Sequence, residues 1–490
     1  MQTQDLYFNF RGGIISPGYL DELLSLASSA RVSHIRFGQR QQMIMEVDEN
    51  RYPSFAKACI EKQVPFYKAG DVCPTLVSSY VGTKIFTTEN WLKESVYKDV
   101  FDLFSHLSTL KINVCDGRQS HTPLYSGHLN WVSSNHLHYW WLFLRLPGTP
   151  EVYPWPELVY TNDLARLSNV LEHLLITAKS EAEKSPEYLF NKTKSSLAIS
   201  TRLPSESFAP PVFHLPYYEG FNKDGDKYWL GIYRRDELFP VECLREICTL
   251  CMETKIGEIY ITSWKSLIIK SIDPQNRKLW DAVLGRFRIN VRHAANELNW
   301  QVEDHCEDGL VLKRHVIRYF DKEDVRTYGL CFAVQTRPLS SVFGSVIIRR
   351  QQRMNTNRRK SMERYDILYT RDFNPNTIDL VLYREGVEKE QLGPYIVSLC
   401  KFYYESQLRE VALKAEHVLE PVTVSRDKTS HVLFQCRHCY TVYDPANGDE
   451  SKGIQPGNAF SRLPDDYVCE LCAAPETAFI QIEKSQLINQ

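Results

Sequence analysis

The sequence has no run of about 18 apolar residues, the length that a membrane-spanning helix requires. Its best apolar stretch, Tyr139 to Leu146, is short and is followed by a proline. The first ten residues show no basic flank followed by an apolar segment, so we expect no secretory leader and a cytoplasmic location. No membrane partner is expected for such a chain.

Neither sign of charge is in excess, because 58 lysine and arginine residues are balanced by 60 aspartate and glutamate residues. Without a global positive field, the chain is not expected to bind nucleic acid. A disulfide framework is not expected either, since the 13 cysteines are odd in number and spread over 490 residues. This usage favours free thiols and metal ligands. The length exceeds what one core supports, which predicts two to four domains.

An internal repeat organises the larger part of the chain. Residues 16–47 align without a gap with residues 240–271, and both copies begin with apolar residues at the i, i+3, i+4, i+7 spacing of a half-buried helix. Each helix leads into a predicted pair of strands, so two copies of one helix-and-hairpin unit predict a pseudo-twofold body. The matched positions are Leu20 with Leu244, Leu23 with Ile247, Leu24 with Cys248, and Ala27 with Cys251.

The segments that follow each copy mix helices and strands, which predicts an α+β architecture. After the second copy we expect strands over residues 311–319, 328–334 and 345–350, and a helix over 395–414. The polar stretch 420–430, which contains Pro421, is expected to be a linker. The expected domains span residues 1–70, 71–227, 228–290, 291–420 and 431–484.

Four cysteines form two Cys-x-x-Cys pairs, Cys436 with Cys439 and Cys469 with Cys472, with 29 residues between the pairs. Each pair places two thiolates on a tight turn, and two such turns complete a tetrahedron of four sulfur ligands. Four thiolates around one iron make a one-electron site, whereas structural zinc uses the same ligands without redox chemistry. The spacing alone leaves both metals open.

The residues between and around these pairs resemble rubredoxin over about residues 431–482. The matching pattern includes Tyr443-Asp444-Pro445, Gly453 to Gly457 and Leu463-Pro464. The resemblance implies a small module with one iron ion in an Fe(Cys)4 centre that shuttles single electrons. It also implies a small aromatic core, and a fold of this size depends on its metal for stability. The expected core residues are Tyr443, Phe460, Tyr467 and Phe479.

Three positions depart from the rubredoxin pattern. Glycine usually follows the second and fourth ligands and proline the third, but this sequence has Tyr440, Ala473 and Glu470 there. The missing glycines are expected to alter the amide-to-sulfur hydrogen bonds that tune a reduction potential. Residues 430–490 carry eight acidic and four basic side chains. Such an acidic carrier is expected to dock on a basic surface of a redox partner, such as a reductase or a ferredoxin/rubredoxin reductase.

The body resembles the sulfite and nitrite reductase family over roughly residues 12–410. That family contains duplicated ferredoxin-like half domains, each followed by a larger mixed domain, and the two repeats here follow the same order. Between them lies the lysine-bearing segment Leu110 to Val114. In the family, basic side chains hold the carboxylates of sirohaem and the substrate anion, which is a role that guanidinium and ammonium groups suit. By position the corresponding residues are Arg36, Arg40 and Lys111.

The family also holds an iron–sulfur cluster through Cys-x5-Cys followed by Cys-x3-Cys. No cysteine pair of this sequence has either spacing, so no [4Fe-4S] cluster is expected. The nearest group, Cys243, Cys248 and Cys251, is expected on the buried face of a helix, where free cysteine is common.

These features predict an electron-transfer protein, in which a rubredoxin-type centre is fused to a degenerate reductase-like body and serves nitrite or sulfite assimilation. One alternative is a sirohaem-containing nitrite or sulfite reductase that is fed by its own rubredoxin. A second is a non-redox protein that uses a zinc ribbon in assembly or regulation. Metal content and absorbance distinguish the three.

Overall fold

The computed structural model divides into a body, Met1–Leu408, and a second unit, Arg409–Gln490. The two units are described separately. Within the described residues no helix is both long and apolar enough to cross a membrane. The expected linker, residues 420–430, lies outside them. The structure describes residues 3–86, 91–104, 108–338, 340, 342–351, 363–377, 379–418, 432–464 and 466–483.

Two five-stranded sheets with the same plan form the centre of the body. The first has the order β15-β3-β4-β1-β5 and the second β13-β14-β17-β16-β2. Helices α1 (Pro17–Ser29) and α2 (Tyr52–Glu61) accompany the first, and α6 (Val241–Glu253) and α7 (Arg277–Arg286) accompany the second. The strands are β1 (Thr3–Phe8), β2 (Ile14–Ile15), β3 (His34–Phe37), β4 (Met43–Asp48), β5 (Tyr67–Lys68), β13 (Gly220–Asp224), β14 (Lys227–Ile232), β15 (Phe239–Pro240), β16 (Ile259–Ile261) and β17 (Leu267–Ile272).

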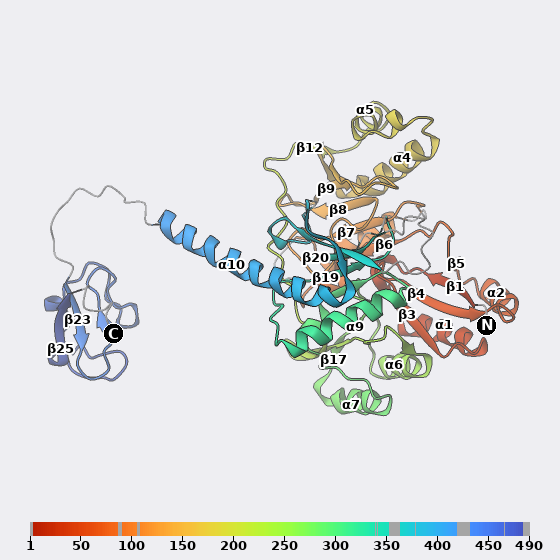
Figure 1. Cartoon of the computed structure of the whole chain (residues 1–490). Coiled ribbons are helices and arrows are strands. Elements are labelled where there is room, and N and C mark those ends of the chain that lie inside the picture. The colour runs from red at the N-terminus through yellow and green to blue at the C-terminus, as the bar shows by residue number, and fades with distance from the viewer. Residues whose placement is uncertain are drawn as a thin grey trace. The chain divides into compact units, whose positions relative to one another are not determined.

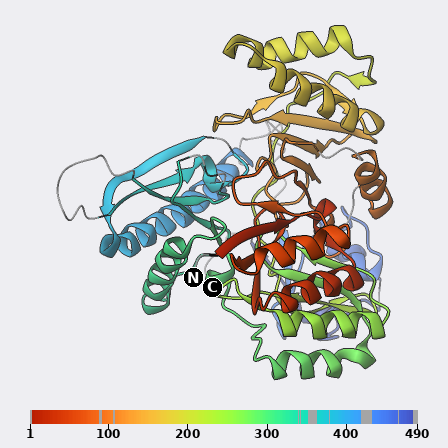
Figure 2. The same ribbon diagram turned by 90° about the vertical axis from the view of Figure 1, so that its right-hand side faces the viewer.

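The two sheets exchange their edge strands. Strand β2 precedes α1 but pairs with β16 of the second sheet, and β15 precedes α6 but pairs with β3 of the first. Helices α1 and α6 lie side by side (Figures 1 and 2). The matched hairpin turns share a left-handed residue, Gln41 (φ 58°) and Lys265 (φ 55°). One continuous hydrophobic core joins Leu20 and Leu24 to Leu244 and Cys248. The structure therefore confirms the duplicated body.

A seven-stranded sheet follows the first repeat, with the order β12-β11-β9-β8-β7-β6 and β10 paired with β9. Strands β6, β7 and β8 are parallel. Trp131 and Trp140 are fully buried in its core, and Trp131 donates to Ser168 Oγ at 3.1 Å. The elements are β6 (Leu76–Ser78), β7 (Ile112–Cys115), β8 (Leu129–Ser133), β9 (Tyr139–Leu144), β10 (Tyr153–Pro154), β11 (Leu158–Tyr160), β12 (Thr201–Arg202), α3 (Glu94–Leu103), α4 (Leu164–Thr177) and α5 (Pro186–Ser196).

A further five-stranded sheet, of order β18-β19-β20-β21-β22, follows the second repeat. The strand expected over residues 311–319 is wrong, because this segment belongs to helix α9 (Glu307–Lys322). Its buried residues Leu310, Lys313, Ile317 and Phe320 recur at three and four positions, which is the helical period. The other elements are α8 (Ala295–Leu298), β18 (Trp300–Val302), β19 (Phe332–Gln335), β20 (Val346–Arg350), β21 (Arg364–Thr370), β22 (Leu380–Glu388) and α10 (Leu392–Val418).

The carboxy-terminal module, residues 432–483, contains a small sheet of order β24-β23-β25. Its strands are β23 (Val432–Cys436), β24 (Val442–Tyr443) and β25 (Phe479–Glu483). The expected aromatic core is confirmed, since Tyr443, Phe460, Tyr467 and Phe479 have ring centroids 5.3 to 6.0 Å apart. Phe434, which the sequence did not single out, stacks on Phe460 at 4.1 Å.

Candidate metal centre and cation-lined cavity

Two equivalent turns carry the four cysteines of the carboxy-terminal module. In the first turn, Cys436 ends β23 and its carbonyl accepts from Tyr440 N at 2.9 Å. In the second turn, the Cys469 carbonyl accepts from Ala473 N at 2.9 Å. Across the first turn the Cys436 amide donates to the Thr441 carbonyl, and across the second the Cys469 amide donates to the Ala474 carbonyl. The repeated geometry aims both thiol pairs at one point.

The four sulfur atoms all lie within 4.8 Å of one another. Cys436 Sγ is 3.6 Å from Cys472 Sγ, and Cys439 Sγ is 3.4 Å from Cys469 Sγ. A tetrahedral metal with bonds of about 2.3 Å to sulfur needs sulfur–sulfur edges of about 3.8 Å. The four thiols therefore form a site with the size and chemistry of an iron or zinc centre.

Tyr440 and Ala473 hold the left-handed backbone that their turns require, with φ of 63° and 54°. These are the two positions at which the rubredoxin pattern has glycine. A side chain in this conformation clashes with its own backbone, at a cost of about 1 kcal/mol per residue. Tyr440 and Ala473 therefore keep the backbone conformation of each turn, but they make the module less stable than glycine would.

The ligands differ in their access to solvent. Cys436 and Cys469 are buried, whereas Cys472 is exposed. The hydroxyl of Thr441 lies 3.1 Å from Cys439 Sγ, and its hydrogen bond lowers the pKa of that thiol to about 6. A thiolate is the ligand form, so this hydrogen bond favours metal binding. One side of the four-cysteine site is therefore open to solvent.

Arg40, on the turn between β3 and β4, has a buried guanidinium whose every donor is used within the chain. Its Nε donates to Thr75 Oγ1, and its terminal nitrogens donate to neutral oxygens of Thr75, Ile112, Asn113 and Ser126. Burial lowers the pKa of Arg40 to about 9. The guanidinium therefore contributes a positive charge that no carboxylate of the described residues contacts.

Lys111 and Arg40 line one cavity of about 420 Å³ in the body. Burial lowers the pKa of Lys111, and the charges of Arg40 and Arg145 lower it further. Arg337 from the loop after β19 lines the same cavity. Arg36 does not, because it is held elsewhere, with its Nη1 3.3 Å from Asp236 O and its Nε 3.5 Å from Glu46 Oε1. The structure thus brings together two of the three basic residues expected from the sequence.

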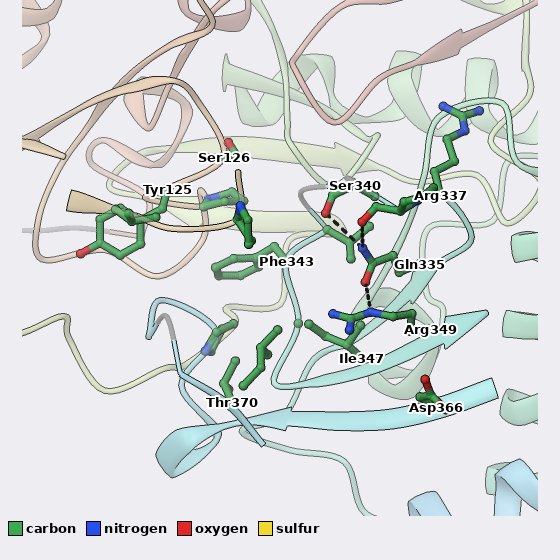
Figure 3. A pocket seen from close by; sticks show the side chains of 18 of the residues that line it. Tyr125, Ser126, Gln335, Arg337, Ser340, Phe343, Ile347, Arg349, Asp366 and Thr370 are labelled. Atoms are coloured by element: carbon green, nitrogen blue, oxygen red, sulfur yellow. Dashed lines mark hydrogen bonds between the residues drawn. The ribbon is translucent and has the colours of Figure 1, made fainter. Parts of the chain in front are cut away.

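A second cavity of about 520 Å³ adjoins the first, since Pro123, Ser126, Arg337, Pro338 and Ser340 line both. The residues that sequence reasoning missed here, Ser126, Arg145 and Arg337, are isolated polar or basic positions with no motif around them. Figure 3 shows the apolar side chains of Phe343 and Ile347 in the wall of this second cavity, together with Tyr125. On one side Arg349 donates to Gln335 Oε1 at 2.8 Å (Figure 3).

The comparisons with known proteins match the carboxy-terminal module and the body to different proteins. A family model for rubredoxin matches residues 433–479. The probable rubredoxin HupI of Bradyrhizobium diazoefficiens is 43% identical over 60 residues, which are 12% of this chain and 87% of that protein. The chain belongs to the rubredoxin family. The carboxy-terminal module is accordingly called the rubredoxin module below.

Other relatives share only part of their length with this chain. The high molecular weight rubredoxin of Moorella thermoacetica is 45% identical over 64 residues, so the chain spans 28% of that protein. For the body, the solved structure of the Mycobacterium tuberculosis NirA protein matches with a TM-score of 0.58 at 13% identity. The match covers 80% of this chain and 79% of NirA. It confirms the sulfite/nitrite reductase-like fold expected for the body.

The cofactor expected from that fold is sirohaem, and the cavity residues fit it only in part. The cations suit carboxylates, but the side chains that line the two cavities include no cysteine or histidine to ligate a haem iron. Among the described residues, three or more Cys, His, Asp or Glu side chains lie close enough to share a metal ion only at the module's four cysteines and at Asp5, Glu46 and His305. Among the described residues that line the two cavities, the basic side chains suit an anion, and none is a cysteine or histidine that could ligate a haem iron.

Proposed function

We propose that the rubredoxin module makes this chain a one-electron carrier. The observation that carries the proposal is the convergence of four thiols within 4.8 Å in a chain that belongs to the rubredoxin family. An iron ion bound there exchanges single electrons between its ferrous and ferric states. Cys436, Cys439, Cys469 and Cys472 are proposed to hold that ion, and the Thr441 hydrogen bond stabilises the thiolate form of Cys439.

The residues around the centre support transfer to another protein. Cys472 is exposed, as are the large side chains of Tyr440 and Leu471 beside it, at 66% and 73%. The module is acidic, so we propose a redox partner with a basic docking surface. Because the body has the NirA fold, we propose that the carrier serves nitrite or sulfite assimilation. A cytoplasmic location is part of this proposal. The body domains are proposed at residues 1–70, 71–227, 228–290 and 291–420.

A potentiometric titration tests this function. The protein, with the metal that it holds as purified, is poised at a series of potentials while its visible absorbance is recorded. We expect a single reversible transition that follows a one-electron curve and involves one electron per chain. A colourless protein that takes up no electrons and holds zinc in the four-cysteine site would contradict the electron carrier. It would support a structural zinc ribbon instead.

A second role, for the body, is supported by Arg40 and Lys111 at one cavity. We infer that this cavity binds an anionic ligand or the carboxylates of a cofactor. Arg36 is proposed to act outside it, as a partner of Glu46. An active sirohaem reductase has less support, because the lining residues offer no ligand for the iron.

A further inference from the structure

Three metal-binding side chains from separate segments of the body converge beside the first sheet. Asp5 on β1 and Glu46 on β4 are direct cross-strand partners, and His305 comes from the loop between β18 and α9. One ligand atom from each residue lies within 4.8 Å of the other two. None of the three lines the cavity that contains Lys111. The group is therefore a feature of its own in the body.

The two carboxylates are placed where they repel each other. Like charges directly opposite on paired strands destabilise a sheet. Arg36 compensates Glu46, since its Nε lies 3.5 Å from Glu46 Oε1. Asp5 has no such partner, because His305 makes the one ion-pair contact that its carboxylate has within the described residues. A cation bound between Asp5 and Glu46 would remove this repulsion.

The imidazole of His305 faces both carboxylates but hydrogen-bonds neither. Its Nδ1 lies 3.5 Å from Glu46 Oε1 and 3.8 Å from Asp5 Oδ2. These distances exceed the length of an N–H···O hydrogen bond, which is about 2.7 to 3.2 Å. They fit two ligands of one metal ion, because bonds of about 2.1 Å in a tetrahedral shell place neighbouring ligand atoms about 3.4 Å apart. The other ring nitrogen, Nε2, is buried without a hydrogen-bond partner.

The loop that carries His305 is fixed by its neighbours. Asp304 accepts from Gln39 N at 3.0 Å and lies 3.3 Å from the buried ammonium of Lys265. The ring of His305 packs edge-on against that of Tyr7 on β1, with centroids 6.4 Å apart. These contacts hold the imidazole beside the two carboxylates without help from an ion.

We propose that Asp5, Glu46 and His305 form a divalent metal site in the body, with water completing the coordination shell. One imidazole nitrogen and two carboxylate oxygens suit zinc and other first-row transition ions, whereas magnesium and calcium favour oxygen ligands alone. The side chain of Glu46 is 43% exposed, which leaves the site open to water. A bound ion would fasten the loop before α9 to the first sheet. This role goes beyond the electron carrier proposed above and does not depend on it.

The test is calorimetric titration of the full-length protein with Zn²⁺, starting from the protein with the metal that its module holds as purified. We expect the body to bind one Zn²⁺ per chain. Loss of a partner that only orients a metal ligand weakens binding about 10- to 100-fold, so Asp5→Asn and His305→Asn should each weaken it about tenfold or more. Asparagine suits position 305 because it tolerates the left-handed backbone there, with φ of 53°. Mg²⁺ should bind at least about tenfold more weakly than Zn²⁺.

Two residues outside the group provide matched controls. Asp48→Asn removes a carboxylate from the same strand as Glu46, and asparagine can still accept from Asn50 N as Asp48 does at 2.9 Å. His173→Asn removes an exposed histidine on α4. Neither should change the affinity for Zn²⁺ by more than about twofold, because isolated surface charges contribute little.

Thermal unfolding of the body is a second readout. All nine tryptophans lie between Trp91 and Trp300, so tryptophan fluorescence reports on the body and not on the module. An ion that binds the folded body raises its melting temperature. Zn²⁺ should therefore raise the melting temperature of the parent and of both controls by more than that of Asp5→Asn or His305→Asn.

Three results would overturn the site. The first is no Zn²⁺ uptake beyond the four-cysteine centre, which would leave His305 as an ion-pair partner of the two carboxylates. The second is unchanged affinity in Asp5→Asn and His305→Asn, which would assign the ion to other residues. The third is equal affinity for Mg²⁺ and Zn²⁺, which would exclude the imidazole as a ligand. The visible absorbance of the module is recorded separately, so failure of this site and failure of the electron carrier remain distinguishable.

Discussion

The rubredoxin module and the body place their chemistry in the chain in opposite ways. The module gathers its ligands from two short turns, Cys436 to Cys439 and Cys469 to Cys472, and its small aromatic core surrounds them. The body assembles its cavity from Arg40, Lys111 and Arg337, which lie on separate elements of a large core. A fold as small as the module depends on a metal for stability, whereas the body has a large hydrophobic core of its own. The cavity of the body can therefore lose residues that one cofactor needs and still bind another ligand, because the fold does not depend on either.

The largest effect is expected from removing a ligand of the module. Cys436→Ala should abolish iron binding and unfold the module, because a fold of this size relies on its metal. The body should be unaffected. Iron content and charge-transfer absorbance report on the module, and fluorescence reports on the body, since all nine tryptophans lie between Trp91 and Trp300.

The control for this variant is Cys306→Ser in the body. Cys306 caps α9 by accepting from Gly309 N at 3.3 Å, and a serine oxygen can do the same. Its iron content should equal that of the parent protein. Loss of body structure in Cys436→Ala would show that the two units do not fold independently.

Acid should destabilise the body through two histidines, the buried His121 and the partly buried His128. Burial lowers the pKa of His121 to about 3 and that of His128 to about 4, with Lys270 acting further on His121 and Lys111 further on His128. Both pKa values lie below the unfolded value of about 6.5, so the stabilisation is complete above that pH. It falls as the pH is lowered towards 4, by about 1.4 kcal/mol for each unit of pKa shift. Urea unfolding followed by fluorescence at pH 7 and pH 5 measures it.

A substitution at His121 sharpens that prediction. His121→Phe removes the titrating ring while keeping an aromatic side chain against Phe86, whose ring centroid is 4.8 Å away. The difference in unfolding free energy between the two pH values should shrink. An unchanged difference would assign the acid sensitivity to other groups.

The two repeats should respond alike to loss of a matched leucine. Leu20 and Leu244 are both fully buried in the shared core of α1 and α6. Leu20→Ala and Leu244→Ala should each lower the unfolding free energy of the body by about 3 kcal/mol. The iron absorbance should not change. A large effect at one site and none at the other would contradict the shared core.

The smallest effect concerns the turns of the module. Ala473→Gly should raise the unfolding free energy of the iron-loaded module by about 1 kcal/mol, because glycine adopts a positive φ freely. The opposite change, Gly448→Ala, should destabilise it, since a Cβ there would lie 2.8 Å from Gln455 C in a left-handed residue. Thermal loss of the iron absorbance measures both. Equal melting of Ala473→Gly and the parent would show that the turn is not strained.

The sequence predicted most where its signals are local. Cys-x-x-Cys spacing and the residues around it identified the module, and the leucine pattern at Leu20 and Leu244 identified the repeat. It failed for residues 311–319, where a mostly apolar run has both a strand-like and a helical interpretation. It also grouped Arg36 with Arg40, although a strand residue and a turn residue four positions apart face different surroundings. Arg145 and Arg337 had no signal, because only the tertiary fold brings them to Lys111.

The most direct test of the central claim is metal analysis together with absorbance spectra of the anaerobically purified protein, first oxidised and then reduced with dithionite. The account predicts one iron per chain and charge-transfer bands that bleach on reduction and return on reoxidation. Zinc in place of iron, with no visible bands in either state, would contradict it.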